Sequence, residues 1–207
     1  MASLIKVAPT KSNLLKLKRQ ANFLEEGHTL LERKRELLTR LVYERLGEYR
    51  RLRAETHTAI KEAYRWLAMA QLRMGSRAIH QVALAMKPAI RVSILPRRSL
   101  GVQYPAVTIE RLPIQPIGLM DTDVSLDSAH QALAEAVYQL ARLAEAEAAL
   151  GRLIAEQRKT QKRVNALKYN VIPRYHATIR NIRAALEEEE RNTLFQIKVL
   201  REQRVEA

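Results

Sequence analysis

The side chains that most often carry out chemistry are few and scattered in this chain. It has no Cys, which excludes disulfides, thiolate zinc sites and cysteine nucleophiles. Its histidines do not occur at the spacing of a metal site, such as two His four residues apart with a carboxylate nearby. The sequence also has neither a glycine-rich phosphate-binding loop nor a Gly-x-Ser-x-Gly turn. We therefore expect no catalytic residues, no metal site and no cofactor. The five histidines are His28, His57, His80, His130 and His176.

Charge is the strongest chemical feature of the sequence. The 207 residues include 36 Lys and Arg against 22 Asp and Glu, a formal net charge of +14. Such an excess can bind nucleic-acid phosphates without sequence preference. The cations share their segments with acids, however, as in Glu32-Arg-Lys-Arg-Glu36, and no aromatic residues are interleaved for base stacking. A structural coiled coil is favoured, and a basic coiled-coil adaptor or non-specific nucleic-acid-binding protein is the alternative.

Proline positions divide the chain into three regions. Five of the seven prolines lie between Pro88 and Pro116, so 10–87 and 117–172 contain none and can form long helices. We expect one structural unit with an all-α fold, in which two long helices enclose a small middle region. Its parts are an N-terminal helix over 10–73, a short helix and β-hairpin over 74–120, and a C-terminal helix over 121–205.

Polar residues mark where both long helices begin. Thr10 follows Pro9 and can cap the first helix, with Ser12 and Asn13 as competing caps. The second helix begins where Asp121, Asp123 and Ser125 offer acidic and hydroxyl groups to the first turn.

Apolar residues recur at steps of three and four along both helices, which is the spacing of a left-handed coiled coil. The helices have only each other to pack against, so we expect them to pair antiparallel. Pro173 should disturb the second helix by leaving the carbonyl of Tyr169 without a donor. Beyond Tyr49 and Leu52 the seam of the first helix becomes smaller and less regular. The seam is predicted to contain Leu14, Leu17, Ala21, Leu24, Leu31, Leu38, Val42, Thr56, Ala59, Ala63, Trp66 and Ala70, and Leu133, Val137, Leu140, Ala144, Val164, Leu167, Val171, Ile179, Ile182, Leu186, Leu194 and Ile197.

The middle region carries a hairpin signal. Residues 91–95 and 100–104 alternate apolar and polar side chains around Pro96-Arg-Arg-Ser99, where we place the turn. Arg97 and Arg98 would then lie at the tip without an acidic partner. A contact with another protein and a merely solvated turn explain them equally well.

No part of the sequence resembles a membrane segment. The longest apolar runs, at 66–70 and 82–86, are about a quarter of the ~20 residues that a spanning helix needs. The first residues lack a signal-peptide core. We expect a soluble protein without direct membrane insertion.

Two blocks at opposite ends of the chain resemble the D subunit of the V-type/A-type ATPases. Two residues depart from the family's usual charges, because Lys168 stands where Glu is usual and Glu32 where Lys is common. These departures affect individual ion pairs. The resemblance rests on Pro9-Thr-Lys-Ser-Asn-Leu-Leu-Lys-Leu-Lys-Arg-Gln20 with Gly27-His-Thr-Leu-Leu-Glu-Arg-Lys-Arg-Glu-Leu-Leu38, and on Lys162-Arg-Val-Asn-Ala-Leu167, Val171-Ile-Pro173, Thr178-Ile179, Ile182 and Leu186-Glu-Glu-Glu-Glu-Arg191.

The resemblance implies a non-catalytic rotor shaft at the cytoplasmic face of a membrane. Its terminal ends would enter a head of catalytic and non-catalytic subunits, where ATP is hydrolysed or made. Its lower part would carry the F subunit of the stalk and rest on the subunit that caps the membrane ring, through which protons or sodium ions pass. No nucleic acid would be bound directly.

Charged residues supply the expected contacts. A basic chain is steered toward acidic surroundings, so we expect weak, distributed contacts between the head and the cations near both termini. Pairing that aligns the two ends would also bring 33–35 opposite 187–190. The expected head contacts are Lys11, Lys16, Lys18, Arg19, Lys198 and Arg201.

Overall fold

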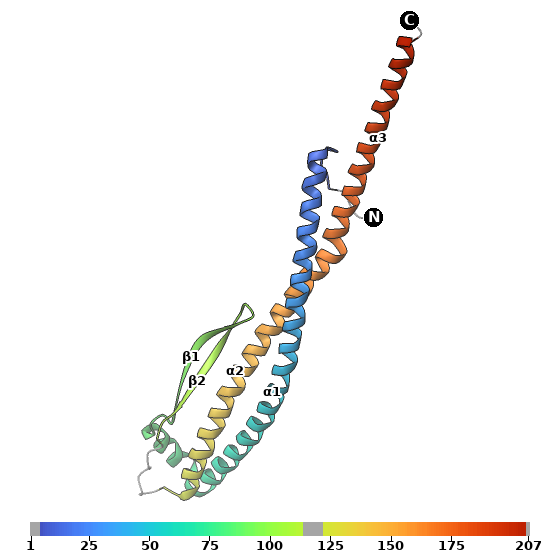
Figure 1. Ribbon diagram of the computed structural model, residues 1–207. Coiled ribbons are helices and arrows are strands. Elements are labelled where there is room, and N and C mark those ends of the chain that lie inside the picture. The colour runs from blue at the N-terminus through green and yellow to red at the C-terminus, as the bar shows by residue number, and fades with distance from the viewer. Residues whose placement is uncertain (1–4, 114–121, 206–207) are drawn as a thin grey trace. The chain divides into compact units, whose positions relative to one another are not determined.

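The computed structural model describes residues 5–113 and 122–205, with side chains as far as 201. It consists almost entirely of helices with one small hairpin, which confirms the predicted fold class (Figure 1). The predicted boundary at 120–121 lies outside the described residues. In chain order the elements are α1 (Lys11–Ala85), β1 (Ile90–Ser99), β2 (Val102–Arg111), α2 (Val124–Ala166), the π-helical turn η1 (Leu167–Val171) and α3 (Ile172–Val205).

Two compact units divide the chain. One combines Met1–Leu37 with Arg158–Ala207, and the other is Leu38–Gln157. Each unit contains a part of α1 paired with a later helical segment. The division at 73–74 and 120–121, drawn from the prolines, stays a prediction.

In the first unit, α1 runs antiparallel to the later helices. Lys11 Nζ lies 2.7 Å from a carboxylate oxygen of Glu190, and Glu25 lies 2.7 Å from His176 Nε2. Farther along α1, Arg35 donates to the side-chain oxygen of Gln161 at 3.5 Å. Residue numbers therefore rise along α1 as they fall along its partner, which is the predicted orientation.

The predicted pairing of 33–35 with 187–190 is wrong. Arg35 contacts Gln161 and the acids of its own helix, Glu32 and Glu36. Lys11 takes the place opposite Glu190, about 36 Å from Arg35 along the helix. The prediction aligned the helix ends, whereas α3 continues past Glu190 to Val205.

Side chains near the start of each long helix cap it as expected. Thr10 Oγ1 accepts from the Asn13 backbone N–H at 3.3 Å, so Thr10 is the cap of α1. Asp123 caps α2 by accepting from the Ser125 backbone N–H at 3.2 Å and from the Ser125 hydroxyl. Asp121, the other acid expected there, lies outside the described residues.

The buried stripe confirms part of the predicted seam. Leu38 is 0% and Ile182 2% exposed, whereas Leu24, Leu31, Ile179 and Leu186 are half-buried. The smaller seam predicted beyond Leu52 is confirmed by buried Thr56, Ala63 and Ala70, whereas Trp66 is exposed. In the second unit, buried Thr56 donates to the carbonyls of Leu52 and Gln139. The seam residues with the least exposure are Leu17, Ala21, Leu38, Leu52, Thr56, Ala63, Ala70, Leu126, Ala129, Ala136, Ala149, Leu150, Leu153, Thr160, Val164, Thr178 and Ile182.

Between 133 and 144 the predicted seam is displaced. Val137, Leu140 and Ala144 are exposed, while Ala136 is buried and Gln139 is half-buried. The prediction followed the bulkiest side chains. In this alanine-rich stretch the small residues face the partner helix, because they allow close approach and leave the larger ones outside.

The π-helical turn η1 ends at Val171, two residues before Pro173. The Ile172 N–H donates to the carbonyl of Leu167, five residues back, in place of the usual four. Proline offers no N–H and its ring crowds the carbonyl four residues before it, so a wider turn relieves the clash. The sequence predicted the disturbance but not its π-helical form.

The hairpin exists, but its predicted turn is misplaced. β1 and β2 pair antiparallel from Ile90 with Arg111 to Ser99 with Val102, and Pro96 pairs with Pro105 inside the ladder. Leu100 and Gly101 form the turn with φ of 50° and 77°, as a type I′ turn requires. The turn was predicted at Pro96 because proline is common in turns. In a two-stranded sheet, however, a proline can lie inside a strand if the side that lacks the N–H faces outward.

Gly75 interrupts α1 close to the predicted start of the middle region. Its φ of 79° and ψ of 153° are not helical, and helix resumes after it as far as Ala85. Glycine allows this conformation because it has no Cβ. The following residues can therefore take a new direction toward the hairpin.

Candidate partner interface

The hairpin is attached to the helices of its unit at both ends. Near the turn, buried Val102 packs in one cluster with Leu38 and Leu153. At the base, Arg111 lies 2.9 Å from Glu135 and 4.0 Å above the ring of Tyr138. β2 is therefore the inner strand and β1 the outer one, as they run beside α2 (Figure 1).

Arg97 and Arg98 lie on the outer strand, so their predicted place at the turn is wrong. Arg97 pairs with Tyr104 in the ladder and Arg98 with Gln103. Arg97 also lines a cavity of about 150 Å³, together with Glu48 and Glu145 and with the arginines Arg45 and Arg142. Since side chains alternate along a strand, Arg98 lies on the opposite face. The two arginines therefore meet different surroundings, and both are exposed.

The terminal cations fall into two groups on the first unit. Lys16, Lys18 and Arg19 are exposed near the start of α1, and no described residue provides them with an acidic partner. Lys198 and Arg201 are exposed near the end of α3. Because Lys11 stands opposite Glu190, the α3 cations lie farther along than the start of α1. The expected contacts form two basic surfaces rather than one cluster.

Lys11 differs from its neighbours because it already has a partner. The hydrogen bond to Glu190, together with the attraction of that carboxylate, raises the pKa of Lys11 above its ordinary value of 10.5. The stabilisation from this pair is complete below that value and is lost as the pH rises through the higher pKa of the folded chain. The charge of Lys11 therefore stabilises the pairing of α1 with α3 through Glu190.

The end of α3 carries four exposed apolar residues, of which the sequence analysis assigned Leu194 and Ile197 to the seam. Leu194 is 68%, Phe195 67%, Ile197 57% and Leu200 62% exposed. The placement of Leu194 and Ile197 in the seam is wrong, because α1 begins opposite Glu190 and none of it lies beside them. Exposed apolar residues at this density mark a contact surface. Their spacing was visible, but only the register showed that they lack a cover.

Neither membrane insertion nor a metal centre is evident in the part of the chain that the structure describes. None of its helices combines the length and hydrophobicity needed to cross a bilayer. Its His, Asp and Glu side chains form no cluster of three or more that could hold a metal ion.

Comparison with known proteins identifies the family. The sequence model that describes the D subunit of ATP synthase matches residues 13–202. The chain belongs to the ATP synthase D-subunit family. It is 36% identical to the V-type ATP synthase D subunit of Thermotoga neapolitana, over 95% of this chain and 97% of that protein. It is 35% identical to the A-type ATP synthase D subunit of Pyrococcus furiosus, over 96% of this chain and 94% of that protein.

Family membership favours a structural coiled coil over the basic adaptor or nucleic-acid-binding protein that the sequence left open. The D subunit is a non-catalytic stalk component of a rotary ATPase, and it associates with other subunits of that peripheral complex. The resemblance seen in the terminal blocks is thereby confirmed over nearly the whole chain. The exposed basic and apolar surfaces are accordingly candidate contacts with those subunits.

Proposed function

We propose that this chain is the central rotor of a V-type/A-type ATP synthase. It transmits torque between ATP hydrolysis or synthesis in the catalytic head and proton or sodium translocation through the membrane ring. The observation that carries this proposal is the family match across residues 13–202. Its membership favours a rotor over a free coiled-coil adaptor or a nucleic-acid-binding protein.

The antiparallel helix pair suits such a role. Two helices packed along a seam resist twisting better than one, and the pair needs no substrate pocket to work. A rotor in a ring of catalytic subunits acts by presenting a different face to each one. Each rotation step then favours one conformation at one catalytic site and a different conformation at the next, because the contact energy between rotor and subunit differs from site to site.

In the complex, each exposed surface of the chain would contact a particular subunit. The end of α3, with Lys198 and Arg201, and the start of α1, with Lys11, Lys16, Lys18 and Arg19, would contact the catalytic and non-catalytic subunits of the head. The F subunit of the stalk and the subunit that caps the ring would contact the second unit. Arg97 and Arg98 would take part in one of these contacts. The complex would hold the chain at the cytoplasmic face of the membrane.

Rotation of the chain within the purified complex tests this function. A bead attached to the chain in immobilised complex should turn in one direction when ATP is added, and should stop when ATP is removed. Complex reassembled without the chain serves as the control, and its ATPase activity should be uncoupled from ion pumping. A chain that does not join the complex, or that stays still during ATP hydrolysis, would refute the proposal.

A further inference from the structure

The seam of the first unit contains a stretch in which neither helix has a fully buried residue. On α1 no residue from 22 to 37 is buried, and on the later helices none from 165 to 177 is buried. The two ranges face each other, because Glu25 pairs with His176 between them. We refer to these two facing ranges as the loose seam.

The seam is well packed on both sides of this stretch. Leu17 and Ala21 are buried on α1 before the loose seam, as are Thr178 and Ile182 on α3. At the other end of the range 165–177, Val164 is buried as well. Covered apolar side chains are what resist movement of one helix against the other. The helix pair is therefore less stiff in the loose seam than in the packed seam beside it.

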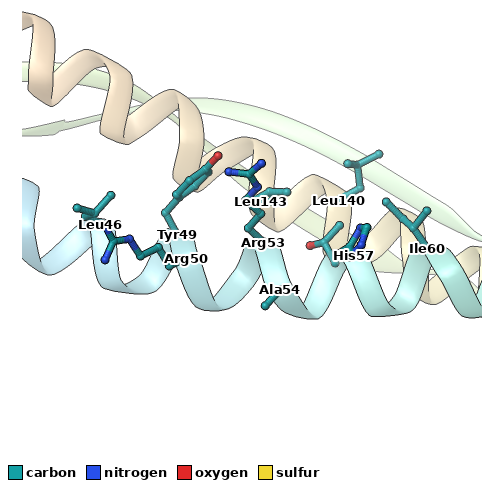
Figure 2. A pocket seen from close by; sticks show the side chains of 10 residues that line it. Leu46, Tyr49, Arg50, Arg53, Ala54, His57, Ile60, Leu140 and Leu143 are labelled. Atoms are coloured by element: carbon teal, nitrogen blue, oxygen red, sulfur yellow. The ribbon is translucent and has the colours of Figure 1, made fainter.

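A polar side chain occupies a place in the loose seam where an apolar one would pack. The side chain of His28 is 16% exposed, and its Nδ1 lies 3.9 Å from Glu32 of the same helix. Its Nε2 is buried and has no hydrogen-bond partner among the described residues. A buried polar atom without a partner costs free energy, so the helix pairing is weakened here. In the second unit, by contrast, apolar Leu46, Tyr49 and Ile60 of α1 lie beside the buried seam (Figure 2).

The backbone of the later helices is weakened in the same stretch. In η1 the Ile172 N–H reaches back to the carbonyl of Leu167, and none of the five residues of this turn is buried. Pro173 has no N–H, so the helix also loses a backbone hydrogen bond there. Wide turns and missing hydrogen bonds are the places where helices bend. Loose packing and a weakened backbone thus coincide at one level of the helix pair.

We propose that the loose seam is an elastic joint, in which the helix pair twists and bends under load while the packed seam on either side stays stiff. The inference rests on the proposed function, because only a rotor carries such a load. The proposed contacts with the head lie at the terminal cations, and those with the stalk and the ring lie in the second unit. Along both helices the loose seam comes between these contacts, so torque must pass through it. A twist stored there lets one end of the shaft advance before the other end follows.

Hydrogen exchange of backbone amides in the full chain measures whether the loose seam is soft. Amides of 165–177 should exchange at least about ten-fold faster than those of 178–186, because few buried contacts oppose local opening. On α1, which has no π-helical turn there, amides of 22–37 should likewise exchange faster than those of 38–52. Equal protection within both pairs of ranges would overturn the proposal.

Two substitutions made together should stiffen the loose seam. His28→Leu places an apolar side chain in the seam and removes the unpaired nitrogen, and Pro173→Ala restores a backbone donor. The double variant should exchange its amides over 165–177 at least about ten-fold more slowly than the wild type. His80→Leu makes the same His replacement at an exposed position of the second unit and should leave these rates unchanged. Unchanged rates in the double variant would contradict the proposal.

Angular fluctuation of the shaft measures the loose seam in the complex. The head, without the membrane ring, is immobilised and ATP is withheld, so that the rotor rests at one angle. The chain has no Cys of its own, so a single Cys in place of exposed Arg77 can hold a bead on the second unit. The bead angles should spread less for the double variant than for the wild type or His80→Leu. An equal spread for all three would place the twist elsewhere and overturn the proposal.

The outcomes separate this inference from the proposed function. If the wild type joins the complex and rotates, but its amides exchange evenly and the double variant has the same angular spread, only the elastic joint fails. If the wild type does not join the complex at all, the chain carries no torque and both proposals fail.

Discussion

Single side chains in the seam contribute according to how completely they are covered. Leu38 is 0% exposed and packs with Val102 and Leu153, whereas adjacent Leu37 is 49% exposed. Leu38→Ala should lower the free energy of unfolding by about 2–5 kcal/mol, because it removes buried contacts and leaves a cavity. Leu37→Ala, with the same chemistry, should change it by less than about 0.5 kcal/mol. Urea unfolding of the isolated chains measures both, and equal midpoints would contradict the assigned seam.

Asp123 links the start of α2 to α1 through charge. The hydrogen bond from Ser125 and then that from Arg73, at 3.1 Å, hold the pKa of Asp123 below its ordinary value of 3.8. The native chain therefore binds this proton less readily than the unfolded chain does. The resulting stabilisation is present above pH 3.8 and is lost as the pH falls through the lower pKa of the folded chain.

The variant Asp123→Asn isolates that charge, because Asn keeps a side-chain oxygen that can cap the helix. The wild type should be the more stable of the two at pH 7, and the difference should shrink below pH 3.8. Urea unfolding at several pH values measures the difference. A gap that stays constant from pH 7 to pH 2.5 would show that the charge plays no part.

Among the elements, the hairpin contains the clearest local strain. Leu100 has a φ of 50°, which costs a residue with a Cβ about 1 kcal/mol or more, and it is 44% exposed. Leu100→Asn creates the Asn-Gly sequence typical of a type I′ turn and should stabilise the chain by about 1 kcal/mol. Gly101→Ala, at a φ of 77° with nothing within 4 Å of the new Cβ, should destabilise it through the backbone alone. Thermal melting should therefore move in opposite directions for the two variants.

The sequence predicted the kinds of elements well but not their register. Periodicity and proline positions are local signals, and they were sufficient for both long helices, the hairpin and the cap at Thr10. The pairing of Lys11 with Glu190 depends on how far α3 extends beyond α1, which no local pattern records. The same gap caused the exposed end of α3 to be assigned to the seam.

The candidate contacts were predictable as residue types more than as surfaces. Exposed cations follow from charge, since exposure is the usual state of Lys and Arg. The positions of Arg97 and Arg98 required the turn to be placed correctly, and Leu100-Gly101 is a weaker turn signal than the proline that competed with it. The cavity lined by Glu48, Arg97 and Glu145 could not be foreseen, because it combines residues of α1, β1 and α2 that meet only in the folded chain.

At the scale of the whole molecule, the proposed rotor function requires two kinds of contact, one that holds a partner fixed and one that lets the chain turn past a partner. Closely packed apolar contacts suit a partner that stays fixed to the chain. Exposed cations suit partners that the chain must pass, because each exposed pair is weak and exchangeable. A single strong buried pair with the head would hold a rotor at one angle.

Loss of several terminal charges together should affect assembly more than loss of any one of them. Replacing Lys16, Lys18, Arg19 and Arg201 by Gln together should weaken assembly with the head and make it less dependent on salt, since fewer screened attractions remain. Each single replacement should change the affinity by less than about five-fold, because an exposed pair contributes at most about 1 kcal/mol. Reassembly of the complex at 50 mM to 500 mM salt, concentrations spanning roughly a three-fold range of screening length, measures both effects.

A control with the same change of net charge separates local contacts from long-range attraction. Arg158, Lys159, Lys162 and Arg163 are exposed cations of α2 away from the two basic surfaces, and their replacement by Gln removes an equal charge. If distributed contacts at the ends hold the head, this variant should assemble more tightly than the terminal one. If both variants assemble equally weakly, the loss of assembly comes from net charge and not from contacts at the ends. If Lys16→Gln alone abolishes assembly, one strong contact dominates.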